Sequence, residues 1–187
     1  KANPDEIAIE SMNTVLGGAF ISRLNMNLRE NKHWSYGAGS LIFPARGQRI
    51  FVAYAPVQTD KTKESVVEIT NELQAILKDR VVTADEVSMA KNNLTLTLPG
   101  QWETNAAVAQ SIKDIVEFKL SPDYYSTYAG KVKALAVNNL NEAAVKVIHP
   151  DNLIWVIVGD REKIEKGIRE LNIGEVKVID ADGRPLK

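Results

Sequence analysis

Apolar residues recur at three- and four-residue intervals along most of the chain, the spacing that places them on one face of an α-helix. Two stretches near residue 45 and two shorter ones after residue 150 are instead rich in residues typical of strands. This pattern predicts helices over 4–16, 20–28, 59–77, 83–98, 102–119, 121–135, 139–149 and 160–171, and strands over 36–45, 48–55, 153–158 and 175–180.

The order of these elements indicates an α+β fold, with a largely antiparallel sheet backed by helices on one face. Ala45-Arg46-Gly47 predicts the turn of a hairpin between the first two strands. The apolar run 153–158 is short enough to be a fully buried strand, and 175–180 alternates as a last strand. No repeat or long linker is visible, so residues 1–187 form one predicted domain.

Local signals support several of the helix boundaries. Asn3-Pro4-Asp5-Glu6 combines an N-cap residue, proline at the first helical position and acids in the first turn. Gly17-Gly18 predicts the end of that helix, and Phe20, Leu24 and Leu28 are expected to share the buried face of the next one. Thr83 and Glu86 have the spacing of a capping box.

Composition excludes several classes of protein. The chain has no cysteine, which excludes disulfides, thiolate zinc sites and thiol catalysis. No run approaches the roughly 18 apolar residues of a membrane span, and a net charge of −1 gives no overall attraction to nucleic acid. Residues 23–58 carry five cations against one acid, which is either a chance fluctuation or a basic groove.

No complete catalytic motif is present. His33 and His149 lie far apart, and neither belongs to a His-Glu-x-x-His motif or its inverse, so no metal ligands are assigned to this chain. His149 is expected to cap a helix end or lie at the surface. His33, between a helix and a strand, is expected to adopt an unusual backbone angle. Neither a Gly-x-Ser-x-Gly elbow nor a phosphate-binding loop occurs.

One segment does carry a specific signal. Leu16-Gly17-Gly18 is followed by Ser22-Arg23-Leu24, then Leu28-Arg29-Glu30, and then Trp34-Ser35-Tyr36-Gly37. In this order and spacing, and with the later strand ending in Gly159-Asp160, the chain resembles the pitrilysin/insulinase family of zinc metallopeptidases, which includes the mitochondrial processing peptidase. The resemblance covers nearly the whole chain. It implies the LuxS/mitochondrial-processing-peptidase-like metallohydrolase fold and a first strand that would precede Lys1.

Members of this family contain two or four copies of the domain, one of which carries an inverted zinc motif on its first helix. The equivalent helix here, 4–16, has no histidine, so the chain resembles the zinc-free copy. The resemblance implies that Arg29 and Tyr36, seven residues apart, face zinc held by a partner domain or subunit. It also implies that Ser35 and Gly37 contact the same peptide substrate. No cofactor is expected in this chain itself, and His33 stands where many relatives have glycine.

The chemistry of this pair is reasonable on general grounds. A guanidinium and a phenol both donate hydrogen bonds, and donors aimed at the oxygen of a peptide carbonyl under attack stabilise the transition state. The edge of the hairpin after Tyr36 could also accept a peptide as an added strand.

Alternatives remain open from the sequence. In one, Arg29 forms a salt bridge with a nearby acid and Tyr36 packs at the start of the strand. In another, the chain is a catalytically inactive scaffold or assembly domain of the same family. A nucleic-acid binder is disfavoured by the near-neutral charge. Both bacterial periplasm and cytoplasm fit the sequence.

Overall fold

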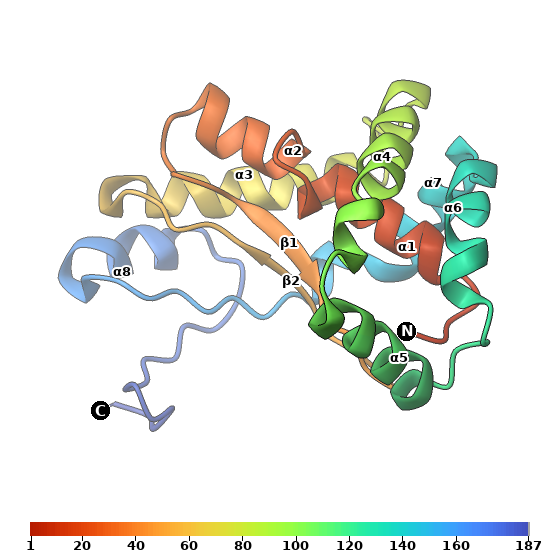
Figure 1. Cartoon of the computed structure of the whole chain (residues 1–187). Helices are drawn as coiled ribbons and strands as arrows, with labels where there is room; N and C mark the ends of the chain where they lie inside the picture. The colour runs from red at the N-terminus through yellow and green to blue at the C-terminus, as the bar shows by residue number, and fades with distance from the viewer. Residues whose placement is uncertain (187) are drawn as a thin grey trace.

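A computed structural model describes residues 1–186 of the chain (Figure 1). Its regular elements, in order, are α1 (Glu6–Asn13), α2 (Arg23–Asn25), β1 (Gly39–Ile42), β2 (Phe51–Tyr54), α3 (Thr62–Ala75), α4 (Ala84–Leu96), α5 (Asn105–Phe118), α6 (Tyr124–Ala134), α7 (Val137–Val147) and α8 (Arg161–Glu170). The wider turns of a π-helix extend α1 over Thr14–Gly18 and α2 over Met26–Asn31.

The hairpin forms an antiparallel sheet in which Ser40 lies opposite Ala53 and Ile42 opposite Phe51. These four residues face the helices, and Ser40 is buried there with its hydroxyl 2.7 Å from the side-chain oxygen of Asn13. The other face is open, because helices pack on one side only. The α+β class with an antiparallel sheet is therefore confirmed, although the strands are shorter than predicted and only two occur within residues 1–186.

The core lies between the inner face of the hairpin and α1, α3, α4 and α7. Its centre is apolar and fully enclosed, with the α1 extension contributing Val15 and Leu16 and the α2 extension contributing Leu28. Figure 1 shows α8 beside α3 at one end of the molecule and α5, α6 and α7 toward the other. Among the described helices none is both long and apolar enough to cross a membrane.

The predicted end of the first helix at Gly17-Gly18 is confirmed. A side chain at Gly17 would place its Cβ 2.3 Å from the backbone nitrogen of Ser40, so only glycine lets the helix end approach β1 this closely. At the other end, Asn3 accepts the N–H of Asp5 as a capping residue does, although the regular helix begins only at Glu6.

Two further predictions for the helices concern the capping box at Thr83 and the side chain of Phe20. The capping box is confirmed, since Thr83 accepts the N–H of Glu86 and Glu86 accepts the N–H of Thr83. The prediction for Phe20 is wrong, because Phe20 lies before α2 and is 62% exposed. Leu24 and Leu28 form the buried face without it.

The prediction of a fully buried strand at 153–158 is wrong. The segment is not assigned to a strand, and its backbone makes no hydrogen bond to any backbone group of residues 1–186. Leu153 and Trp155 pack against the core, while Ile154 and Val158 are each 93% exposed. Because the residues on both sides of this run are apolar, the sequence indicates burial on both sides. In the structure, only the side that carries Leu153 and Trp155 packs against the core.

The last predicted strand, 175–180, is also wrong. Within the described chain this segment makes a single bridge, between Ile179 and Pro185, and otherwise runs irregularly. Alternation along a sequence predicts a strand only where a neighbouring strand is within hydrogen-bonding reach, and among residues 1–186 only the short stretch 184–186 pairs with this segment.

Candidate functional site

Arg29 lies on the helical segment 23–31, which α2 and its π-helical extension form together. Leu24 and Leu28 are buried and fix the inner side of this segment. Arg29 remains at the surface with its side chain 37% exposed. Single π-helical turns occur often at functional sites, because the wider turn shifts side chains out of the regular helical positions.

His33 ends this helical segment in a left-handed conformation, with φ of 58°. The prediction of an unusual backbone angle here is thus confirmed. The N–H of His33 donates to the carbonyl of Arg29 at 3.2 Å, and the N–H of Trp34 donates to that of Leu28 at 2.9 Å. These bonds satisfy carbonyls that would otherwise lack partners at the helix end, and they turn the chain toward β1.

Ser35 and Gly37 build the bend that follows. The hydroxyl of Ser35 lies 2.7 Å from the carbonyl oxygen of Pro56 and 2.8 Å from that of Gly37, and it accepts the N–H of Gly37 at 3.0 Å. A hydroxyl has one proton and two lone pairs, so these contacts use most of its capacity. Ser35 therefore shapes the loop, and the bend leaves Tyr36, between the two, 97% exposed.

Arg29, Ser35 and Tyr36 line one pocket of ≈ 540 Å³. The remaining lining residues are Glu30, His33, Trp34, Pro56, Val57 and Gln58. Gly37 is not among them, so its predicted place at the site is limited to the bend beside the pocket.

The guanidinium of Arg29 has two neighbours. Its carbon lies 4.6 Å from the ring centroid of Phe20, and its Nε lies 3.3 Å from a carboxylate oxygen of Glu30. Both ionic side chains are more than a third exposed, and such pairs contribute little to stability. Arg29 thus forms the salt bridge that the alternative interpretation expects, whereas Tyr36 does not pack against the strand as that interpretation requires.

Sequence reasoning did not single out Phe20, Trp34 or Gln58 as parts of this site. Trp34 stands within the quoted motif and could have been included from its position there, and the ammonium of Lys32 lies 5.2 Å from its ring centroid. Phe20 was assigned to the core, and no signal in the sequence distinguishes it from a core residue. Gln58 comes from the far side of the hairpin, where its side chain donates to the carbonyl of His33 at 3.2 Å.

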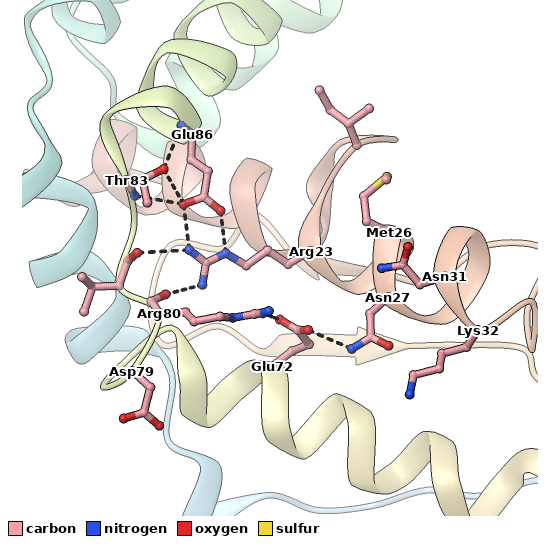
Figure 2. A pocket seen from close by; sticks show the side chains of 12 residues that line it. Arg23, Met26, Asn27, Asn31, Lys32, Glu72, Asp79, Arg80, Thr83 and Glu86 are labelled. Atoms are coloured by element: carbon pink, nitrogen blue, oxygen red, sulfur yellow. Dashed lines mark hydrogen bonds and ion pairs between the residues drawn. The ribbon is translucent and has the colours of Figure 1, made fainter.

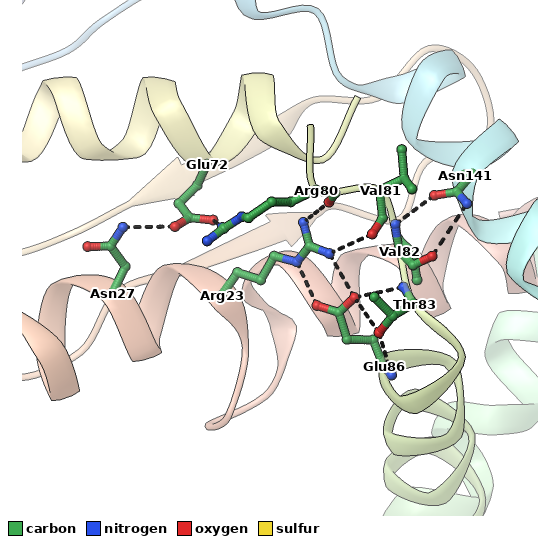
Figure 3. Close-up of polar contacts among 9 residues, drawn as sticks. All are labelled: Arg23, Asn27, Glu72, Arg80, Val81, Val82, Thr83, Glu86 and Asn141. Atoms are coloured by element: carbon green, nitrogen blue, oxygen red, sulfur yellow. Dashed lines mark hydrogen bonds and ion pairs between the residues drawn. The ribbon is translucent and has the colours of Figure 1, made fainter. Parts of the chain in front are cut away.

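A second, larger cleft of ≈ 800 Å³ lies beside the same helical segment (Figure 2). Arg23 extends into it and donates to both carboxylate oxygens of Glu86, at 2.7 Å each. The same guanidinium donates to the backbone carbonyls of Arg80 and Val81. Figure 3 shows these contacts converging on one side chain, which is only 10% exposed.

The polar contacts continue along this cleft. Glu72 accepts from Arg80 and from the amide of Asn27, at 2.8 Å in the latter pair, and the same amide lies 2.9 Å from Glu68. Lys32 pairs with Glu68 at 3.3 Å. We call this set the ion-pair ladder: Arg23, Asn27, Lys32, Glu68, Glu72, Arg80 and Glu86.

Three of the five cations in residues 23–58 pair with acids from other parts of the chain. Arg23 and Lys32 pair with acids of α4 and α3, and Arg49 pairs with Glu6 of α1. The acids therefore come from outside the basic stretch, and it forms no continuous basic groove. Burial raises the pKa of Glu86, but hydrogen bonds from Arg23 and Thr83 outweigh it and hold that pKa below its ordinary value.

Within residues 1–186 no group of three or more histidine, cysteine, aspartate or glutamate residues could hold a metal ion. The first pocket presents the hydrogen-bond donors of Arg29 and Tyr36 beside the aromatic ring of Trp34.

Comparison with known families decides what kind of domain this is. Residues 1–94 match the family model described as the peptidase M16 inactive domain. The chain belongs to this family. The matched residues include the helical segment 23–31, the hairpin and most of α4, so the resemblance to the pitrilysin/insulinase peptidases is confirmed.

Solved structures support the same fold. The peptidase M16 inactive domain from Pseudomonas fluorescens is 21% identical with a TM-score of 0.73, over 80% of this chain and 35% of that one. A protease from Helicobacter pylori is 19% identical with a TM-score of 0.62, over 77% and 35%. A chain of complex III2 from Candida albicans is 15% identical with a TM-score of 0.64, over 77% and 36%.

At these identities the likeness concerns the fold. The chain spans about a third of the length of each of these three structures. No curated protein matches the chain.

Proposed function

We propose that this chain is the zinc-free, peptide-binding domain of an M16 zinc metalloendopeptidase. In this role it contributes Arg29 and Tyr36 to a substrate site whose zinc is held by a homologous domain or subunit. Membership of the M16 inactive-domain family supports the assignment to a peptidase. The pocket that contains both side chains supports their joint role.

The observation that carries the proposal is the exposure of Tyr36. A phenol that is 97% exposed gains nothing from packing, and Tyr36 lines the same pocket as Arg29, next to the bend made by Ser35. Tyr and Trp are favoured in binding surfaces because a large rigid ring carries a polar group. The phenol can donate to a peptide carbonyl oxygen, and the guanidinium can hold a second carbonyl or a carboxylate in register.

In this proposal the zinc ion is held by the partner domain or subunit. It would polarise the scissile carbonyl and activate water there. The residues of this chain bind and orient the peptide, and their donors stabilise the negative charge that develops on its carbonyl oxygen.

The test combines this chain with a zinc-bearing M16 domain and measures cleavage of a quenched fluorescent peptide. Loss of one donor to the developing oxyanion lowers kcat by about 100- to 1,000-fold, and we expect losses of this order in Arg29→Ala and Tyr36→Phe. Tyr54→Phe is the matched control, since Tyr54 is 47% exposed and lies outside the pocket. Unchanged rates in both site variants would overturn the assigned roles and favour an assembly domain.

We also propose that residues 1–187 form one domain whose sheet is completed by a further strand, as the resemblance to the family implies. The unpaired backbone of 153–158 and the exposed Ile154 and Val158 support this proposal. Amide hydrogen exchange tests it. Amides of this segment should exchange without protection in the present chain and become protected in a polypeptide that includes the strand.

A further inference from the structure

The helical segment 23–31 connects the two clefts, because Arg23 stands at its first turn and Arg29 near its end. At its start, the segment is held by the ion-pair ladder. At its end, the guanidinium of Arg29 lies against the ring of Phe20 and pairs with the partly exposed Glu30. The position of Arg29 is therefore set by how the whole segment is seated, and much less by contacts of its own.

We propose that Arg23 is a positioning residue for Arg29, and that the ladder sets the axial position and rotation of the segment that carries it. This inference rests on the proposed function only where it concerns peptide binding. Its geometric part concerns the segment itself.

The apolar contacts of the segment do not by themselves fix its axial position and its rotation. Leu24 and Leu28 define which side is buried, but apolar contacts are not directional, so they tolerate small rotations and shifts. The π-helical turns at 26–31 are an uncommon helical geometry, and such turns need support from their surroundings. A directional contact is needed to select one arrangement.

Arg23 supplies such a contact toward α4, in addition to buried Asn25, whose side chain donates to the carbonyl of Phe20 at 2.6 Å and accepts the N–H of Ala38 at 3.1 Å. The planar fork of Arg23 meets both oxygens of Glu86 and the carbonyls of Arg80 and Val81, which belong to the start of α4 and the loop before it (Figure 3). Glu86 is itself held by the capping box with Thr83, so the acceptor is rigid. A lysine at position 23 would keep the charge but could not reproduce this set of contacts.

One turn further on, Asn27 repeats the attachment through Glu68 and Glu72 of α3. Lys32 adds a pair with Glu68 just beyond the segment. Figure 2 shows Arg23, Asn27 and Lys32 along one side of the segment. Successive polar contacts to two different helices leave little freedom for the segment to slide or turn.

The experiment compares Arg23→Lys with Arg169→Lys, a matched control whose arginine pairs with Glu165 on α8 outside the ladder. The first readout is the NMR signals of the Arg29 Nε–H and the Trp34 indole N–H, which report the pocket without any ligand. We expect both signals to shift in Arg23→Lys and to stay in place in the control. Unmoved signals in a folded Arg23→Lys variant would overturn the inference.

The second readout is the affinity for a fluorescein-labelled unstructured peptide, measured by anisotropy. We expect Arg23→Lys to weaken binding about tenfold, and to have no further effect in an Arg29→Ala background. An equal loss in both backgrounds would mean that Arg23 does not act through Arg29, and would also overturn the inference.

Failure of the proposed function gives a different result. If the unaltered chain and Arg29→Ala bind the peptide equally, the peptide-binding role is wrong, and the NMR shifts alone decide the positioning role. Should Arg23→Lys fail to fold, Glu86→Gln replaces it. This variant removes the charge from the acceptor while keeping an oxygen for the capping box, and the same shifts are expected.

Discussion

The two clefts on either side of the helical segment 23–31 differ in whether their charged side chains already have partners within the chain. In the larger cleft Arg23 is nearly buried and all of its contacts are made within the chain. In the smaller pocket Arg29 is more exposed, and the phenol of Tyr36 is almost completely so. Satisfied groups contribute to stability, whereas exposed donors are available to a ligand. The same helix thus has a structural side and a side suited to binding.

The largest effect on stability is expected from removal of Arg23, the nearly buried arginine of the larger cleft. Arg23→Ala removes the guanidinium that donates to Glu86 and to two backbone carbonyls, and leaves the Glu86 carboxylate with Thr83 as its donor. We expect the free energy of unfolding to fall by about 3 kcal/mol. Urea denaturation measures this change. Arg169→Ala, which breaks an exposed pair on α8, should cost less than about 1 kcal/mol. Equal effects would contradict the distinction.

The next largest effect is expected from acid, which should weaken the contact between Arg23 and Glu86. The pKa of Glu86 is lowered in the folded chain, so its contribution to stability is fully present above the unfolded pKa near 4.5 and is lost as the pH falls through the lower, folded value. The free energy of unfolding, measured by urea denaturation from neutral pH into this acid range, should therefore fall less steeply in Glu86→Gln than in the unaltered chain. An identical acid dependence would show that Glu86 carries no such linkage.

A smaller effect is expected from the helix cap that holds the acceptor. Thr83→Ala removes the oxygen that accepts the N–H of Glu86, and loss of such a cap costs about 1 kcal/mol. Thermal unfolding followed by circular dichroism provides the measurement. Thr97→Ala is the control, because that hydroxyl bonds the carbonyl of Asn93 and caps no N-terminus; a larger loss in Thr97→Ala would contradict the prediction.

The smallest effect on stability should come from the open pocket. Tyr36→Phe and Arg29→Ala each remove an exposed group, and we expect changes within about 0.5 kcal/mol in the free energy of unfolding. Paired with the loss of cleavage proposed above, this outcome would separate binding from stability. A destabilisation as large as that of Arg23→Ala would instead place Arg29 in the structural framework.

The sequence predicted the helices better than it predicted the sheet. Spacing alone placed the ends of most helices, the hairpin and the capping box at Thr83. The family resemblance singled out Arg29, Ser35 and Tyr36, and all three line the same pocket. The segments 153–158 and 175–180 failed because strand formation depends on a neighbouring backbone that sequence patterns do not reveal.

The sequence by itself thus determined the helices, the turn chemistry and a motif specific enough to indicate the family. Only the tertiary structure decided which of its arginines are already occupied. Arg23 meets Glu86 across 63 positions of sequence, while the guanidinium of Arg29 meets a neighbour in the chain and one ring nearby. Ion pairing between distant residues depends on how the helices pack against one another, and no local pattern of charges records that packing.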